Sequence, residues 1–170
     1  GKYRDPFFST NNFLCKGIDD ETTGDMLKRY ASDVIGQHPQ VVVILAGAND
    51  IAQNNGVFVT AEQISSNIFY MAKMAQEAGI KVVLCSVLPS SGYNWNTNAA
   101  PANFIPQLNT IVEEWAANNN CEYVDYYSLF VQADGSLDPK FSNDNCHLLT
   151  EGYYIMEQAI MPILEPMLNK

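Results

Sequence analysis

The stretch Val41-Val42-Val43-Ile44-Leu45-Ala46-Gly47-Ala48-Asn49-Asp50 decides the fold of this chain. Its first six residues form an unbroken apolar run rich in β-branched side chains, which is typical of a strand buried on both faces of a parallel sheet. Gly47 then allows a sharp turn of the backbone. We therefore expect Asn49 at the carboxyl end of a central strand, with its side-chain amide free to point into a cleft.

Strand and helix signals alternate on both sides of this stretch, which favours one α/β domain over residues 1–170 with a mainly parallel sheet. The expected strands lie near residues 13–16, 41–46, 80–88 and 122–125. The expected helices, inferred from apolar residues at helical spacing, lie near residues 25–35, 60–78, 104–118 and 150–168. Residues 90–103 are expected to form a long loop at a strand's carboxyl end, where open α/β sheets usually bind ligands.

The composition excludes several classes of protein. Nine basic and nineteen acidic residues give a formal net charge of −10, so a nucleic-acid partner is not expected, because such binding depends on Lys and Arg. The longest apolar run is too short to span a membrane. No signal peptide is visible, although a leader lost together with the N-terminus would make the protein secreted or periplasmic.

The sequence offers no sign of a metal or cofactor. Its four cysteines form no Cys-x-x-Cys pair, and Cys15, Cys85 and Cys121 are expected to pack as small apolar side chains. A flavodoxin-like nucleotide binder is disfavoured because no glycine-rich phosphate loop is present.

A second informative stretch, Asp144-Asn145-Cys146-His147, precedes the last expected helix. If its spacing forms one helical turn, the carboxylate and the imidazole become neighbours. A carboxylate in that position fixes the tautomer of a histidine and stabilises its protonated form, as a general base requires. The alternative is an ordinary surface pair at the start of a helix.

Two further residues could stabilise negative charge. The amide of Asn49 is one candidate donor to an oxyanion, and the backbone N–H of Gly17 is another. The alternative for both is turn chemistry, which also favours asparagine and glycine.

Together these residues resemble three sequence blocks of the SGNH hydrolases, also called GDSL-type esterases and lipases. Lys16-Gly17-Ile18 with Glu21-Thr22-Thr23 resembles the glycine block, and residues 46–50 resemble the asparagine block. Residues 144–147 with the following Leu-Leu-Thr-Glu-Gly-Tyr resemble the acid–base block. The resemblance runs from about Phe13 to the last helix. It implies a three-layer α/β/α, flavodoxin-like sandwich with strand order 2-1-3-4-5.

The resemblance also implies a function. His147 would be the general base, Asp144 its orienting acid, and Asn49 and Gly17 the oxyanion donors of a serine esterase that acts on acyl or acetyl esters of small molecules or carbohydrates. The family's nucleophile block is not found, since no Gly-Asp-Ser or Gly-Asn-Ser occurs. Residues 2–8 look like the helix that follows that block. We therefore expect the serine to precede Gly1, and this chain to be weakly active or inactive.

The strand that carries this serine would lie between the strands at 13–16 and 41–46, so its loss would leave unpaired backbone and exposed apolar surface. We expect either that these two strands pair directly or that a second copy fills the gap, giving a homodimer. A degenerate, non-catalytic domain that binds carbohydrate or a protein partner is the competing function.

Other nucleophiles and the substrate-binding residues complete the prediction. Cys146 is expected to pack rather than react, because a residue adjacent to the base usually points elsewhere. Four serines could substitute for the nucleophile, but none lies at a strand–turn–helix corner; they are Ser9, Ser86, Ser90 and Ser91. Tyr93 and Trp95 are the candidate substrate-binding residues, with the alternative that they are merely exposed loop aromatics.

Overall fold

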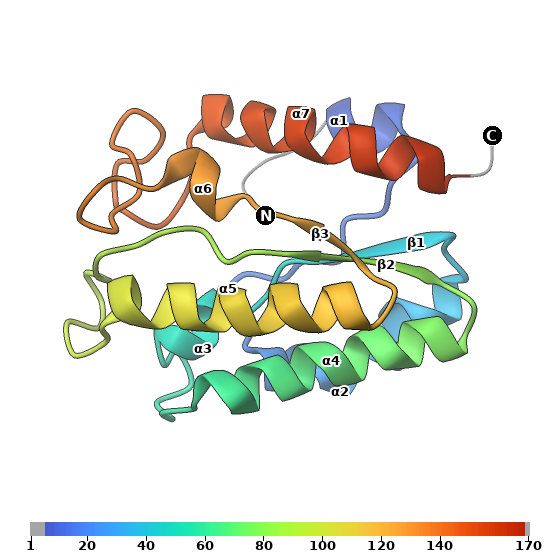
Figure 1. Cartoon of the computed structure of the whole chain (residues 1–170), viewed down its shortest axis with the longest axis horizontal. Coiled ribbons are helices and arrows are strands. Elements are labelled where there is room, and N and C mark those ends of the chain that lie inside the picture. Colours follow the sequence, from blue (N-terminus) through green and yellow to red (C-terminus); the bar gives the residue numbers. More distant parts are fainter. Residues whose placement is uncertain (1–5, 169–170) are drawn as a thin grey trace.

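The computed structural model describes residues 6–168, in which a three-stranded parallel sheet lies between two layers of helices (Figure 1). The strands are β1 (Val41–Ile44), β2 (Lys81–Cys85) and β3 (Glu122–Val124), in the order β1-β2-β3. In the register of the sheet, Val43 pairs with Val83, and Val83 pairs with Glu122. The predicted α/β class is confirmed. The order β1-β2-β3 matches the 3-4-5 part of the expected strand order 2-1-3-4-5.

Helices on opposite faces of the sheet bury its two sides (Figure 1). One face is covered by α2 (Thr23–Asp33), α4 (Ala61–Glu77) and α5 (Pro101–Asn118), and the other by α1 (Pro6–Thr10) and α7 (Thr150–Met167). The shorter elements are η1 (Ile35–Gln37), α3 (Ala48–Ile51) and α6 (Tyr127–Phe130).

Local sequence explains where the two best-defined helices begin. In α2 and α4 the residue before the helix is a threonine whose hydroxyl accepts a hydrogen bond from a backbone N–H of the first turn, and the side chain three residues later accepts a bond from the threonine's own N–H. This reciprocal arrangement satisfies backbone donors that would otherwise have no partner.

Strand β2 shows why a parallel strand reads as a continuous apolar run. Val82 and Leu84 pack on the α4–α5 side, whereas Val83 and Cys85 pack on the α7 side. All four side chains are buried, and each contributes on the order of 1–3 kcal/mol by leaving water.

The expected strand at residues 13–16 was wrong. Residues 13–18 have no regular structure, and Leu14 is 64% exposed. Within residues 6–168, β1 pairs with β2 alone, so the expected direct pairing of residues 13–16 with residues 41–46 was also wrong. An extended segment without a neighbouring strand gains no ladder of hydrogen bonds. The packing predicted for Cys15 fails for the same reason, since Cys15 is exposed.

The unpaired side of β1 coincides with exposed apolar side chains. Val43 and Leu45 are 41% and 39% exposed although they belong to the most apolar run of the sequence. The helix expected at residues 2–8 is seen only as α1, because residues 2–5 lie outside the described residues. In the described part of the chain, no helix is both long enough and apolar enough to cross a membrane.

Candidate active site

Gly47 sets the direction in which the chain leaves β1. Its φ is 118° and its ψ is −20°, a conformation that side chains disfavour. A β-carbon at this position would lie 3.0 Å from Leu108 Cδ2 and 3.2 Å from Ile64 Cγ2. Only glycine therefore fits both the backbone and the core, and the turn brings Asn49 into the first turn of α3.

A buried hydrogen-bonded pair holds α3 against the start of α2. Asp50 Oδ2 accepts from the Thr23 backbone N–H at 2.8 Å, and Asp50 Oδ1 accepts from Thr23 Oγ1 at 2.7 Å. Asn67 Nδ2 donates to the same hydroxyl oxygen at 2.9 Å. Burial raises the pKa of Asp50, and the bonds from Thr23 oppose that rise. The backbone beside Asn49 is therefore fixed.

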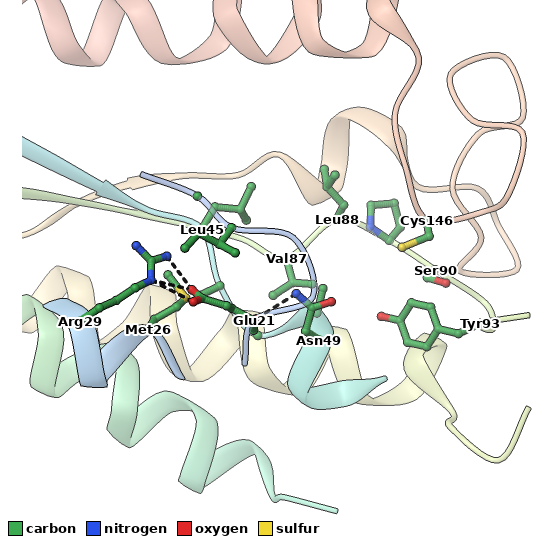
Figure 2. Close-up of a pocket in the computed structure, with 16 residues that line it drawn as sticks. Glu21, Met26, Arg29, Leu45, Asn49, Val87, Leu88, Ser90, Tyr93 and Cys146 are labelled. Carbon is green, nitrogen blue, oxygen red and sulfur yellow. Dashed lines mark hydrogen bonds and ion pairs between the residues drawn. The ribbon is translucent and has the colours of Figure 1, made fainter. Parts of the chain in front are cut away.

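The Asn49 side chain is hydrogen-bonded at both ends of its amide. Nδ2 donates to the Glu21 carbonyl at 2.9 Å, as Figure 2 shows, and Oδ1 accepts from Asn54 Nδ2 at 2.8 Å. Asn54 Oδ1 in turn accepts from the indole N–H of Trp95 at 2.9 Å. Sequence reasoning missed Asn54, because Asn-Asn-Gly is read as a turn.

A pocket opens beside Asn49 at the carboxyl end of the sheet (Figure 2). The predicted oxyanion residues Gly17 and Asn49 both line it, together with Leu45 after β1 and with Ser90 and Tyr93 after β2. The two candidate donors are thus brought to one cavity. Among residues 6–168, none accepts a hydrogen bond from the N–H of Gly17.

Asp144 and His147 are direct neighbours, as their spacing predicts. Asp144 Oδ2 lies 2.7 Å from His147 Nδ1. The segment does not form the helical turn on which that prediction was conditional. Asp144 Oδ1 instead accepts from the backbone N–H groups of Cys146 at 3.0 Å and His147 at 2.7 Å, closing a turn around the aspartate. This turn places the imidazole against the carboxylate with no helix needed.

The charge of Asp144 is well stabilised. Burial is the largest single influence on its pKa and raises it, but the hydrogen bonds from His147 and from the backbone of Cys146 together outweigh burial, so that the pKa falls to about 2. An ionised Asp144 can hold a proton on Nδ1 of His147, which leaves Nε2 as the basic nitrogen.

No hydroxyl or thiol within residues 6–168 is hydrogen-bonded to His147 Nε2. The four candidate serines bond elsewhere: Ser9 to Pro6, Ser86 to Tyr127 and Asp125, Ser90 to Gly92, and Ser91 to Asn145. Burial, with a smaller effect from the charge of Asp144, raises the pKa of the Cys146 thiol to about 11. Cys146 is therefore a protonated lining residue near neutral pH, and no activated thiolate.

The two predicted aromatic residues meet beside His147. Tyr93 is buried and lines the pocket, whereas Trp95 is half exposed. Their ring centroids are 5.1 Å apart, and the Trp95 ring lies 6.2 Å from that of His147. Trp95 therefore contacts His147 on one side and is hydrogen-bonded to Asn54 on the other.

Asn145 connects the turn at residues 144–147 to the loop that carries Tyr93 and Trp95, and sequence reasoning missed this contact too. Its Nδ2 donates to Ser91 Oγ at 2.8 Å, and its Oδ1 accepts from the Leu137 N–H at 2.8 Å.

Comparison with known proteins identifies the family. A family model described as GDSL-like Lipase/Acylhydrolase matches residues 3–155. The chain belongs to this family. The crystal structure of a GDSL-like lipase from Bacteroides thetaiotaomicron shares 37% sequence identity, with a TM-score of 0.91 over 95% of this chain and 80% of that one. The resemblance and the α/β fold class inferred from the sequence are thereby confirmed.

Two proteins of lower sequence identity to this GDSL-family chain extend the comparison. The structure of acetyl xylan esterase AlAXEase has the same fold at 20% identity, with a TM-score of 0.74 over 92% of this chain and 86% of that one. Lipoprotein YqeF of Bacillus subtilis is 26% identical over an alignment of 141 residues that covers 73% of this chain. The chain spans 58% of the length of that curated relative.

Proposed function

We propose that this GDSL-family chain carries the base and the oxyanion donors of a serine ester hydrolase. The observation that carries the proposal is the Asp144–His147 pair, with Nε2 free of any described partner, joined through Trp95 and Asn54 to the amide of Asn49. A base and an oxyanion donor in one network are what acyl transfer requires.

The proposed reaction follows from these positions. A serine hydroxyl attacks the ester carbonyl and gives its proton to His147 Nε2, while Asp144 stabilises the resulting imidazolium. The N–H groups of Asn49 and Gly17 stabilise the negative carbonyl oxygen. His147 then returns the proton to the leaving alcohol, and water releases the acyl group by the same steps.

We further propose that residues preceding Gly1 supply this serine on a strand that pairs with the open side of β1. The exposure of Val43 and Leu45 along β1 supports this arrangement, as does the exposure of Ile18 at 55% across the pocket. A strand inserted between them would bury all three side chains and satisfy the backbone of β1.

The proposed substrate is an acetyl ester of a carbohydrate. A half-exposed tryptophan beside a catalytic base offers a flat apolar face to a sugar ring, and Trp95 is such a residue. The fold relative AlAXEase is named as an acetyl xylan esterase, which agrees with this class.

The test compares p-nitrophenyl acetate hydrolysis by this chain with hydrolysis by a version extended upstream to include a Gly-Asp-Ser or Gly-Asn-Ser block. The extended protein should be active, this chain should be nearly inactive, and His147→Ala should abolish the gain. Equal, His147-dependent rates in both proteins would refute the proposed origin of the nucleophile.

The lack of a described hydroxyl at Nε2 also supports a second candidate, a domain that binds a carbohydrate or protein without catalysis. That function predicts ligand binding that survives His147→Ala and no activity on extension.

If instead a second copy covers β1, sedimentation should show a dimer of this chain that dissociates when the upstream strand is added.

A further inference from the structure

We propose that Asn54 is a positioning residue that sets the orientation of the Asn49 amide and couples it to occupancy of Trp95. This inference rests on the proposed role of Asn49 as an oxyanion donor. It concerns a residue outside the three family blocks, in the loop that follows α3.

The two ends of the hydrogen-bond chain determine its direction. The indole N–H of Trp95 can only donate, so Asn54 must turn its oxygen toward Trp95 and its NH₂ group toward Asn49. The carbonyl of Glu21 can only accept, so it requires the Nδ2 of Asn49. A donor at one end and an acceptor at the other therefore exclude the flipped form of either amide.

This orientation leaves one useful proton. An amide nitrogen carries two hydrogens, and the Glu21 carbonyl takes one from Asn49. The other is available to a ligand in the pocket that Asn49 lines. Had Asn49 been flipped, its oxygen would face the same place and would repel a developing oxyanion.

Asn54 is held firmly enough to act in this way. Besides the side-chain bond, its backbone N–H donates to the Asn49 carbonyl at 3.1 Å. Both asparagines are partly buried, where hydrogen bonds are stronger than in water and polarise one another along a chain. Donation from Trp95 therefore strengthens donation from Asn54, which makes the remaining N–H of Asn49 a better donor.

Trp95 connects this chain of hydrogen bonds to the substrate. It is half exposed, and its ring lies 6.2 Å from that of His147. A ring stacked on Trp95 would shift or shield the indole, and the two asparagines would transmit that change to Asn49. Substrate binding and oxyanion stabilisation are thus coupled.

The structure provides a matched control. Asn96 Nδ2 donates to the Ala52 carbonyl at 3.0 Å and so joins the same two loops without touching the Asn49 amide. If Asn54 served only to attach the loops, Asn96→Ala would have the same effects as Asn54→Ala.

The experiment uses the 170-residue chain labelled with ¹⁵N, in which only two indole resonances occur, from Trp95 and Trp115. Phenyl acetate is the probe. In the parent chain and in Asn96→Ala, the Trp95 indole and the Asn49 amide should shift together with one dissociation constant. In Asn54→Ala the indole should still respond, while the Asn49 amide should not follow.

Asn54→Asp tests the donor-to-acceptor direction of the hydrogen bonds from Trp95 through Asn54 to Asn49. Aspartate can still accept from Trp95 but cannot donate to Asn49, so the indole resonance should stay close to its parent position while the two Asn49 amide protons shift even without ligand. An Asn49 amide that is unchanged in both Asn54 variants overturns the inference.

The extended, serine-containing protein separates this inference from the proposed function. There, Asn54→Asp should lower kcat about tenfold or more, toward the ~10²–10³-fold typical of losing a whole oxyanion donor, with KM within about twofold and Asn96→Ala near parent. An inactive extended protein whose Asn49 amide still depends on Asn54 would refute the esterase function alone. An active one with unchanged kcat in Asn54→Asp would refute the role of Asn54.

Discussion

Replacing Gly47 by alanine is expected to destabilise the protein strongly, because two independent penalties meet at one residue. A side chain at a φ of 118° costs about 1–2 kcal/mol. The new β-carbon would also lie 3.0 Å from Leu108 and 3.2 Å from Ile64, both fully buried, and such overpacking costs about 1–3 kcal/mol. The expected loss in the free energy of unfolding is the sum, about 2–5 kcal/mol.

Two other glycines separate these penalties. Gly79 has a φ of 76°, and no atom lies within 4 Å of the place that a β-carbon would take, so alanine there carries the backbone penalty alone, about 1–2 kcal/mol. Gly17 has no φ between +20° and +160°, and no atom lies within 4 Å of the place that its β-carbon would take. Gly17→Ala should change stability by no more than about 0.5 kcal/mol, and it also keeps the backbone N–H proposed for the oxyanion.

Urea unfolding followed by far-ultraviolet circular dichroism measures all three variants. The urea concentration at the midpoint should be highest for Gly17→Ala, lower for Gly79→Ala and lowest for Gly47→Ala. The dependence of the unfolding free energy on urea concentration should have the same slope in all three variants, because the area exposed on unfolding is unchanged. Equal midpoints for Gly47→Ala and Gly79→Ala would refute the steric argument. A Gly47→Ala midpoint equal to that of Gly17→Ala would refute both.

Three further predictions concern the site. Asp50→Ala should cost about 2–4 kcal/mol of stability, since it leaves buried donors of Thr23 without an acceptor; an unchanged urea midpoint would contradict this. Asp144, with a pKa of about 2 in the folded chain against ~3.9 unfolded, should add stability above about pH 4 that is lost as the pH falls through about 2; a carboxyl resonance titrating near 4 would disprove it. Asn145 has a φ of 60°, so Asn145→Gly should lose about 1 kcal/mol less unfolding free energy than Asn145→Ala. Hydrogen exchange of the Leu137 amide should accelerate in both variants, because its N–H donates to Asn145 Oδ1.

Strands were predictable where a single residue run carried the whole signal. Residues 41–46 and 80–88 are apolar and rich in β-branched side chains, and both yielded strands, although each strand ends earlier than the run does. Residues 13–16 looked similar but were not a strand, because strand formation also requires a partner, and a partner is not visible in a local pattern.

The site was predictable to the extent that its residues are close in sequence. Asp144 and His147 are three residues apart, so their contact could be inferred even though the turn that joins them was not. Asn54 could not be found, because its bond to Trp95 spans 41 residues and its local context indicates only a turn. Nothing in the sequence distinguishes an asparagine that shapes a loop from one that orients another amide.

Under the proposed function, one explanation covers both the unpaired side of β1 and the absence of a described hydrogen-bond partner at His147 Nε2. The pocket lies between the segment at residues 17–21 and the residues that follow β1, which is where a strand added to β1 would end. A single upstream segment would therefore complete the sheet and deliver a nucleophile at the same edge. Because both deficits are met by one piece of chain, stability and activity should rise together on extension, and a serine-to-alanine change in that segment should remove the activity while keeping the stability.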